Sequence, residues 1–180
     1  IIQQCILQVL EPICEAKFHN HSYGFRPNRA TKDAIARCQY LINQVGLHYV
    51  VDLDIKSFFD NVNHGKLIKQ MWSMGIIDQR IISIIGKILK SEIKDIGIPK
   101  KGTPQGGIIS PLLANICMNE FDWWLSNQWE TFKTEYKYCN LSNRYRSLKK
   151  SELKEFYFVR YADDFKIFCK DYETARKLFI

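Results

Sequence analysis

The stretch FYFVRYADDFKIFC, residues 156–169, carries the strongest local signal for structure in the sequence. Two short runs rich in aromatic and β-branched residues flank the tetrapeptide YADD, a pattern typical of two strands joined by a tight turn. It predicts a β-hairpin with Asp163 and Asp164 at its tip. Asp is common in turns for conformational reasons alone, so this stretch by itself does not indicate a function.

A second strand is predicted at HYVVDLDI, residues 48–55. Val51 and Leu53 alternate with Asp52 and Asp54, so the apolar side chains share one face and the acids share the other. Acids at a strand end are costly unless something compensates their charge, and carboxylate oxygens are the ligands that Mg²⁺ prefers. Together with the acids of YADD, Asp54 predicts a site for two Mg²⁺ ions, which would support nucleotidyl transfer.

Apolar residues at helical spacing predict helices elsewhere in the chain. The segments are residues 1–18, 30–44, 64–73, 78–90 and 110–124. We expect the buried face of the first helix to carry Ile2, Ile6, Val9 and Ile13, and we expect core positions for Trp123 and Trp124. Helices and strands alternate irregularly, so the fold class is mixed α/β or α+β and not a regular βαβ array.

Composition places the chain among folded, basic proteins. Its 180 residues include 26 Lys and Arg against 19 Asp and Glu, a net charge of +7, and 46% are apolar. That apolar content excludes a disordered chain. The sequence contains neither the roughly 20-residue apolar run of a membrane span nor a signal-peptide pattern. It does not begin with Met, and we interpret it as a piece of a longer protein.

The six cysteines form no CxxC pair, and most have apolar neighbours. They are predicted to be free thiols in a reducing compartment and not disulfide partners. We therefore expect a protein of the bacterial cytoplasm or of an organelle matrix, neither secreted nor inserted in a membrane.

The positive charge is concentrated in residues 131–150, TFKTEYKYCNLSNRYRSLKK, which contain six basic residues and one acid. The aromatic residues interleaved with them are Phe132, Tyr136, Tyr138 and Tyr145. Phosphate-binding charge mixed with rings that can stack on bases indicates a nucleic-acid surface. A solvated loop with one charged face would have the same composition, so this segment alone leaves both interpretations open.

Three further motifs give YADD more weight. The motif DIKSFFD, residues 54–60, places Phe59 close after the first acid. The motif GTPQGG, residues 102–107, is a turn-rich loop before a helix and offers backbone N–H groups and a Gln amide to a nucleotide. The motif YGFRP, residues 23–27, carries Arg26 in a rigid turn. Each motif is weak alone, but in this order they form a specific set with YADD.

The sequence resembles the reverse transcriptases encoded by group II introns, often called intron maturases. The matching stretches are IIQQCILQVLEPI (1–13), SYGFRPNRATKDAI (22–35), VVDLDIKSFFDNVNH (50–64), GTPQGGIISPLLANICMNEFD (102–122) and FVRYADDFKIF (158–168). The resemblance runs from residue 1 to about 125 and resumes from about 156. The combination of PQGG, SPLLANI and YADD is highly specific.

The resemblance implies an α+β fold, the fingers and palm of a right-hand polymerase with an antiparallel palm sheet packed on helices. The implied regions are partial fingers at 1–48, a first part of the palm at 49–90, a connection with the PQG loop at 91–109 and a second part of the palm at 110–180. Residues 126–155 match no motif and are interpreted as an insertion on the palm. The N-terminal fingers hairpin and the C-terminal thumb of the family lie outside this sequence.

Position by position, the resemblance assigns Asp54, Asp163 and Asp164 to a catalytic triad that binds two Mg²⁺ ions. The backbone carbonyl of Ile55 is implied as a further metal contact. Asp52 shares a strand face with Asp54, and we expect it to be solvated or to support a ligand from behind.

The resemblance also assigns residues to the nucleotide and the nucleic acid. Phe59 would pack under the sugar and disfavour a 2′-hydroxyl, and Gln105 and Gly106 would contact the incoming nucleotide. Arg26 is expected to support the nucleotide or template pocket. The positions implied near primer and template are Tyr161, Ala162 and Gly107.

The implied function is RNA-directed DNA polymerase activity, with a second role in the splicing and mobility of a host intron. The implied partners are an RNA template (the host intron RNA), a DNA primer or target and dNTPs, and a homodimer is left open. We expect the insertion to contact RNA through Arg144, Arg146, Lys149 and Lys150. The alternatives are a catalytically silent RNA-binding splicing scaffold, or a reverse transcriptase of a retron, diversity-generating or CRISPR-linked type.

Overall fold

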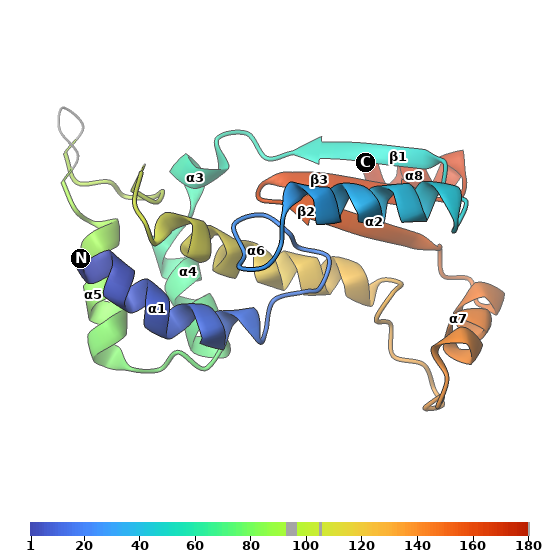
Figure 1. Ribbon diagram of the computed structural model, residues 1–180, viewed down its shortest axis with the longest axis horizontal. Helices are drawn as coiled ribbons and strands as arrows, with labels where there is room; N and C mark the ends of the chain where they lie inside the picture. The colour runs from blue at the N-terminus through green and yellow to red at the C-terminus, as the bar shows by residue number, and fades with distance from the viewer. Residues whose placement is uncertain (93–96, 105, 180) are drawn as a thin grey trace. The chain divides into compact units, whose positions relative to one another are not determined.

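The computed structural model describes residues 1–92, 97–104 and 106–179 (Figure 1). The chain divides into two compact units, and each is described by itself. The first unit comprises Ile1–Asn20, Phe25–Asn28 and Ile55–Glu120. The second unit comprises His21–Gly24, Arg29–Asp54 and Phe121–Ile180.

Helices make up most of the first unit. They are α1 (Ile2–Glu15), α3 (Phe58–Asn61), α4 (His64–Ser73), α5 (Gln79–Leu89) and the first part of α6 (Ser110–Asn127). Asp78 is the N-cap of α5, because its carboxylate accepts hydrogen bonds from the backbone N–H groups of Arg80 and Ile81. Asn63 caps α4 in the same way by accepting from Lys66. The predicted helices at 64–73 and 78–90 are confirmed.

Helix α1 forms where it was predicted but buries a different face. Ile6, Leu10 and Cys14 are buried, whereas Val9 and Ile13 are exposed. The chain has apolar residues at helical spacing on both faces, so spacing alone cannot select the face that meets the rest of the unit. The expected buried face was therefore wrong in all positions except Ile6.

The second unit contains a three-stranded antiparallel sheet in the order β1-β3-β2. Its strands are β1 (Tyr49–Asp54), β2 (Phe156–Tyr161) and β3 (Asp164–Cys169). β2 and β3 form the predicted hairpin, and β1 pairs with the other side of β3. The central strand is thus the one that begins at the second acid of YADD.

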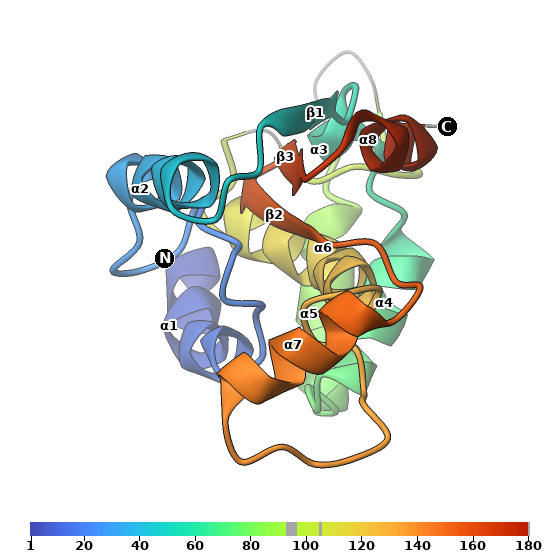
Figure 2. The ribbon, with the colours of Figure 1, turned by 90° about the vertical axis from the view of Figure 1, so that its right-hand side faces the viewer.

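Helices flank this sheet in the second unit (Figure 2). α2 (Thr31–Asn43) packs on β2, and α8 (Tyr172–Phe179) packs on β1 and β3. The end of α6 contributes Phe121, whose ring meets Phe165 edge-on at 5.3 Å. Between α6 and β2 the chain forms a further helix, α7 (Leu141–Lys150). The arrangement confirms helices packed on a small antiparallel sheet.

The two tryptophans near the end of α6 that were expected in the core, Trp123 and Trp124, are exposed instead. Trp123 and Trp124 are 40% and 56% exposed, whereas Trp129, just beyond the helix, is fully buried. The inward face of this part of α6 carries Asp122 and Leu125, which are both buried. An acid on the buried face was not expected from the sequence, and it turns the two tryptophans toward solvent.

The six cysteines are free, as predicted, with Cys14 and Cys169 buried and Cys5 and Cys139 exposed. Burial raises the pKa of the Cys14 thiol to about 12 and that of Cys169 to about 11. Across the described ranges, the structure contains no helix with the length and apolar character needed to cross a membrane.

Candidate active site

The three predicted acids of the triad all lie in the second unit, at one end of the sheet. The β1–β3 register pairs Asp54 with Asp164, and Asp163 is in the two-residue turn that precedes β3. Asp54 and Asp164 are exposed, and Asp163 is half-buried. Residues far apart in the sequence are therefore brought together by strand pairing, as a shared site requires.

The donor set suits a hard divalent cation in its chemistry and in its backbone positions. Paired residues on antiparallel strands have Cα atoms about 4.5–5.5 Å apart, and carboxylates are preferred Mg²⁺ ligands. Within the described part of the chain, however, no three His, Cys, Asp or Glu side chains already converge into a metal-sized group. Gathering Asp54 and Asp164 around an ion requires rotation of their exposed side chains, so the two Mg²⁺ ions stay a prediction.

A lysine neutralises part of this acidic end. The Lys166 ammonium lies 2.5 Å from Asp52 Oδ1 and 3.1 Å from Asp164 Oδ1. The hydrogen bond to Asp52, and then that to Asp164, raise the pKa of Lys166 above its ordinary value, so the side chain stays charged at neutral pH. Asp52 and Asp164 thus share one cation, and the expected role of Asp52 outside the triad stays a prediction.

The turn that carries Asp163 has a strained backbone. Ala162 has φ +59°, whereas the φ of Asp163 is not positive. Positive φ at only the first turn residue matches a type II′ hairpin turn, a position that usually holds Gly. An Ala held there needs support from its surroundings.

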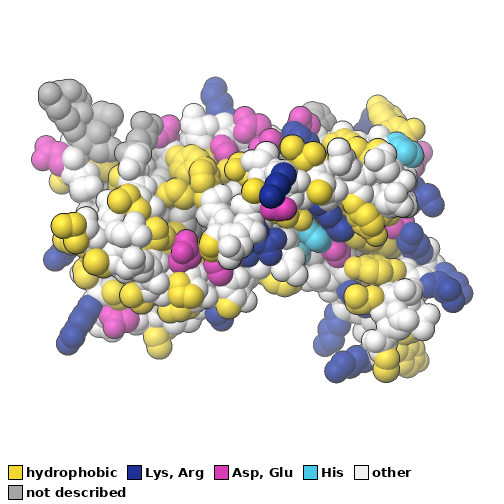
Figure 3. Space-filling view, in the orientation of Figure 1, with side chains coloured by type: hydrophobic (Ala, Val, Ile, Leu, Met, Phe, Trp, Pro, Cys, Tyr) yellow, Lys and Arg dark blue, Asp and Glu magenta, His cyan; other side chains and the backbone are white. Residues whose placement is uncertain are grey.

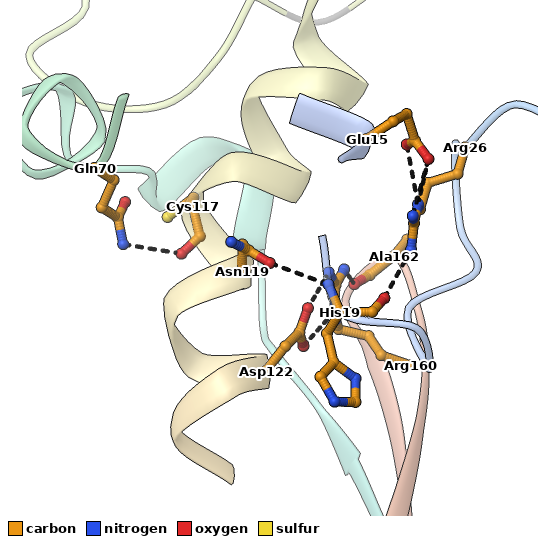
Figure 4. A network of polar contacts seen from close by, with 9 residues as sticks. All are labelled: Glu15, His19, Arg26, Gln70, Cys117, Asn119, Asp122, Arg160 and Ala162. Atoms are coloured by element: carbon orange, nitrogen blue, oxygen red, sulfur yellow. Dashed lines mark hydrogen bonds and ion pairs between the residues drawn. The ribbon is translucent and has the colours of Figure 1, made fainter. Parts of the chain in front are cut away.

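Arg160 and Asp122 supply that support, and the sequence analysis missed both (Figure 4). The Arg160 guanidinium donates to both carboxylate oxygens of Asp122, at 2.8 and 2.6 Å, and to the carbonyl of Ala162 at 2.7 Å. Arg160 and Asp122 are 1% and 0% exposed. The available signal was an Arg inside an apolar strand and an Asp inside an apolar helix, since buried charges need partners.

The first unit brings together two motifs assigned to the nucleotide. Thr103 N donates to the carbonyl of Phe59 at 2.8 Å, and Gly102 N donates to that of Val62 at 2.7 Å. The start of GTPQGG therefore packs against the segment that carries the predicted sugar-contacting ring. That ring is half-buried and meets the rings of Phe58 and Phe25 edge-on.

The rest of the PQG loop is only partly described. Gln105 lies outside the described residues. Gly106 is exposed with φ +73°, and Gly107 is half-buried, with its N–H bonded to the Pro104 carbonyl. Ile55 is half-buried in the first unit, and Tyr161 is 37% exposed in the second. Their assigned contacts to metal, nucleotide and primer stay predictions.

Arg26 is bonded within the first unit. Its guanidinium forms a bidentate ion pair with Glu15 at 2.8 and 2.9 Å and donates to the carbonyl of His19 at 2.7 Å (Figure 4). The side chain is buried and also lies over the Phe18 ring. These bonds hold the end of α1 to the loop after it, and the expected support of a nucleotide or template pocket stays a prediction.

The predicted RNA-contacting residues lie on and around α7 in the second unit, where Figure 3 shows Lys and Arg side chains gathered. Arg146 and Lys150 are exposed. Arg144 is half-buried and donates to the carbonyl of Phe132 at 3.0 Å, and Lys149 forms an ion pair with Glu155 at 2.9 Å. A hollow of about 520 Å³ lies beside them in the preceding loop. Its lining includes Phe132, Lys133, Tyr136, Lys137, Tyr138 and Arg144.

Comparisons with known proteins identify the family. Residues 1–179 match the family model described as reverse transcriptase (RNA-dependent DNA polymerase). Protein YkfC of Escherichia coli is 34% identical over 183 residues, which cover 94% of this chain and 48% of YkfC. The group II intron-encoded protein LtrA of Lactococcus lactis is 38% identical over 125 residues, covering 68% of this chain and 20% of LtrA. The chain thus spans about half of one relative and a fifth of the other.

A solved structure shows the same fold. Telomerase from Candida tropicalis, in a complex with a fragment of telomeric RNA, superposes with a TM-score of 0.57 over 97% of this chain and 29% of its own. The two sequences are 15% identical, so the likeness bears on the fold alone. The predicted α+β fold of polymerase fingers and palm is confirmed. The chain belongs to the reverse transcriptase (RNA-dependent DNA polymerase) family, and within that family it is a relative of group II intron-encoded proteins.

Proposed function

We propose that this chain carries the nucleotidyl-transfer site of an RNA-directed DNA polymerase encoded by a group II intron. The observation that carries the proposal is the cross-strand pairing of Asp54 with Asp164, beside the turn that holds Asp163, in a member of the reverse transcriptase family. The three acids are the ligands for two Mg²⁺ ions. When bound, these ions would neutralise phosphate charge and lower the pKa of the attacking hydroxyl.

In the proposed reaction the 3′-oxygen of a primer attacks the α-phosphate of a dNTP. A P–O bond to the primer forms as the bond to pyrophosphate breaks, and the hydroxyl proton leaves to solvent. Asp54 and Asp163 would hold the metal ions, with Asp164 and the Ile55 carbonyl in support. Positioning and electrostatics account for most of the rate in such transfers.

The nucleotide is proposed to lie against Phe59 and the PQG loop, with Gln105 and Gly106 as contacts and Gly107 in support. The hydrogen bond between Thr103 and the Phe59 carbonyl supports this pairing, because it fixes the loop to the ring's own backbone. The ring would stack under a deoxyribose and exclude a 2′-hydroxyl. Tyr161 and Ala162 are proposed to lie by the primer end.

The partners are proposed to be an RNA template, a DNA primer and dNTPs, with the host intron RNA as template and as the substrate of a splicing role. The exposed cations of α7 and the rings of the preceding loop support an RNA contact in the second unit. This contact would hold RNA and take no part in the chemistry.

Primer extension on an RNA template with dNTPs and Mg²⁺ tests the proposal. The full-length protein should extend the primer, and Asp163→Asn should lower the rate by on the order of 10³-fold, the scale on which charge stabilisation acts in phosphoryl transfer. Asp78→Asn is a matched control, since Asn keeps the oxygen that caps α5 and the site is untouched.

Two results would count against the proposal. Primer extension at an unchanged rate by the Asp163→Asn variant would show that YADD takes no part in the reaction. No extension by the parent, with RNA binding equal in parent and variant, would favour the silent splicing scaffold instead.

A further inference from the structure

The turn that carries the proposed metal ligands is attached to the second unit by a buried charge. Arg160 directly precedes YADD, and its Nη1 donates to the carbonyl of Ala162 at 2.7 Å. That carbonyl belongs to the peptide group that joins Ala162 to Asp163. Nε and Nη2 both donate to Asp122. These two bonds fix the plane of the guanidinium group whose Nη1 donates to the turn.

The backbone of Arg160 is fixed as well. Its N–H donates to the carbonyl of His21 at 2.9 Å, and its carbonyl accepts from Tyr23 N at 2.9 Å. These bonds form a parallel bridge centred on Ser22 and Arg160. The segment His21–Gly24, which includes the start of YGFRP, therefore runs beside β2 and ends at the YADD turn.

Gly24 ends that segment in direct contact with the turn. A β-carbon at Gly24 would lie 2.3 Å from Ala162 N and 3.0 Å from the Tyr161 carbonyl carbon. Both are backbone atoms of the turn, so no side-chain rotation could relieve the overlap. Any residue larger than Gly at this position therefore requires a shift of the turn or of the Gly24 backbone that packs against it.

We propose that Arg160, Asp122 and Gly24 are positioning residues for the proposed polymerase reaction. The buried Arg160–Asp122 pair stabilises the positive-φ conformation of Ala162, and Gly24 leaves the space that this conformation occupies. Together they fix the peptide plane from which Asp163 projects. The inference rests on the proposed function, because its consequence is the geometry of the metal ligands.

Gly24→Ala is the informative variant, because it keeps both residues of the buried ion pair and perturbs the contact between Gly24 and the turn. Gly86→Ala is its matched control, since Gly86 lies in α5 with no atom near the added carbon and no positive φ. Primer extension would give kcat and its Mg²⁺ dependence. Mn²⁺ binding, followed by electron paramagnetic resonance without nucleotide, would report on the ligands independently of turnover.

We expect Gly24→Ala to lower kcat by about 100-fold, the scale of loss from a misplacement of about 1 Å. The Mg²⁺ concentration for half-maximal rate and the Kd for Mn²⁺ should both rise by roughly tenfold or more, as when support behind metal ligands is lost. RNA binding and the parent Tm should be nearly retained. Gly86→Ala should match the parent in every assay.

A second variant keeps the test decisive if Gly24→Ala does not fold. Arg160→Met combined with Asp122→Leu removes both buried charges at once, which such sites tolerate far better than the loss of one partner. It also removes the bond to the Ala162 carbonyl. The folded double variant should show the same weakened Mn²⁺ binding and reduced kcat.

The outcomes separate this inference from the proposed function. Extension by the parent, with unchanged kcat and Mn²⁺ binding in a folded Gly24→Ala or double variant, would overturn the positioning role and leave the polymerase intact. No extension by the parent, with Mn²⁺ binding that these variants weaken, would overturn the polymerase and support the positioning role. A parent that neither extends nor binds Mn²⁺ would overturn both.

Discussion

The YADD hairpin and the basic segment of residues 131–150 belong to the same unit but hold their charges in opposite ways. In the hairpin, Arg160 is buried, paired with the buried Asp122 of α6 and bonded to the backbone of the turn. In the basic segment, Arg146 and Lys150 are exposed, and Lys149 is a half-exposed partner of the largely buried Glu155. One region uses charge to fix a backbone and the other presents charge to solvent.

This difference in burial matches the two functions proposed for these regions, metal binding and RNA binding. Metal-bound chemistry tolerates little displacement, so its exposed acids stand on a rigid buried support. Binding to RNA phosphates depends on charge number and tolerates mobile side chains, because counterion release does not need fixed geometry. The same residue type, arginine, serves either purpose according to its burial.

The largest expected effect comes from breaking the buried pair. Arg160→Met should lower the free energy of unfolding by about 3–5 kcal/mol, because it leaves the Asp122 carboxylate buried without its partner. Arg146→Met, on the exposed face of α7, should change it by less than about 0.5 kcal/mol. Urea unfolding of both variants gives the comparison, and equal effects would contradict the division drawn between the two regions.

The second largest expected effect is on the salt dependence of RNA affinity. Changing Arg144, Arg146, Lys149 and Lys150 to Gln should reduce the slope of log K against log salt by about 2.8, at roughly 0.7 for each phosphate contact to a single strand. Filter binding across a salt series measures the slope.

A matched control for that series makes the same charge change on α4 and α5. The control residues are Lys66, Lys69, Lys87 and Lys90, changed to Gln. An unchanged slope in the variant of the basic segment, or an equal change in the control, would contradict a specific RNA contact in that segment.

The YADD hairpin and the basic segment each contain a cysteine, and the reactivity of the two thiols can be compared. Cys169 is buried in β3, where burial raises its pKa to about 11, and Cys139 is exposed in the basic segment. At pH 8, iodoacetamide should alkylate Cys139 quickly and Cys169 only after unfolding, as mass spectrometry would detect. Equal labelling of the native protein would show that the hairpin opens as readily as the loop.

The raised pKa of Cys169 also gives a pH dependence. An unfolded thiol ionises near pH 9, whereas the folded one holds its proton to about pH 11. Its stabilising contribution is therefore complete below pH 9 and is lost as the pH rises toward 11. Cys169→Ala should flatten the loss of Tm in that window, whereas Cys139→Ala should leave the profile unchanged.

The smallest effect is expected for the Lys149–Glu155 ion pair. Lys149 is half-exposed in this pair, so a double-mutant cycle with Lys149→Met and Glu155→Gln should give a coupling energy of about 0.2–1 kcal/mol. A coupling as large as that of a buried pair would show that the basic segment is more rigidly held than its exposure indicates.

Local patterns predicted much of the fold. Alternation in β1 placed Val51 inside and the acids outside, and the two apolar runs around YADD formed the hairpin. The family motifs pointed to the three acids that strand pairing brings together. These features succeed because each depends on neighbours in the sequence or on a motif of fixed order.

Features that depend on distant partners escaped prediction. The contact of Gly24 with Ala162 and the pairing of Arg160 with Asp122 join separate segments, and no periodicity encodes them. The buried position of Asp122 also explains why Trp123 and Trp124 face solvent. The ion pair of Arg26 with Glu15 likewise could not be predicted from the sequence pattern.

The strand order has a consequence for how the chain is made. β1 is synthesised well before β3, its only partner in the described sheet. The β2–β3 hairpin is local and can close within about 1–10 μs, whereas β1 must wait for a partner whose residues have yet to leave the ribosome. Until then the edge of β1 is open to pairing with other chains, so chaperone dependence should be set by the time between the two strands.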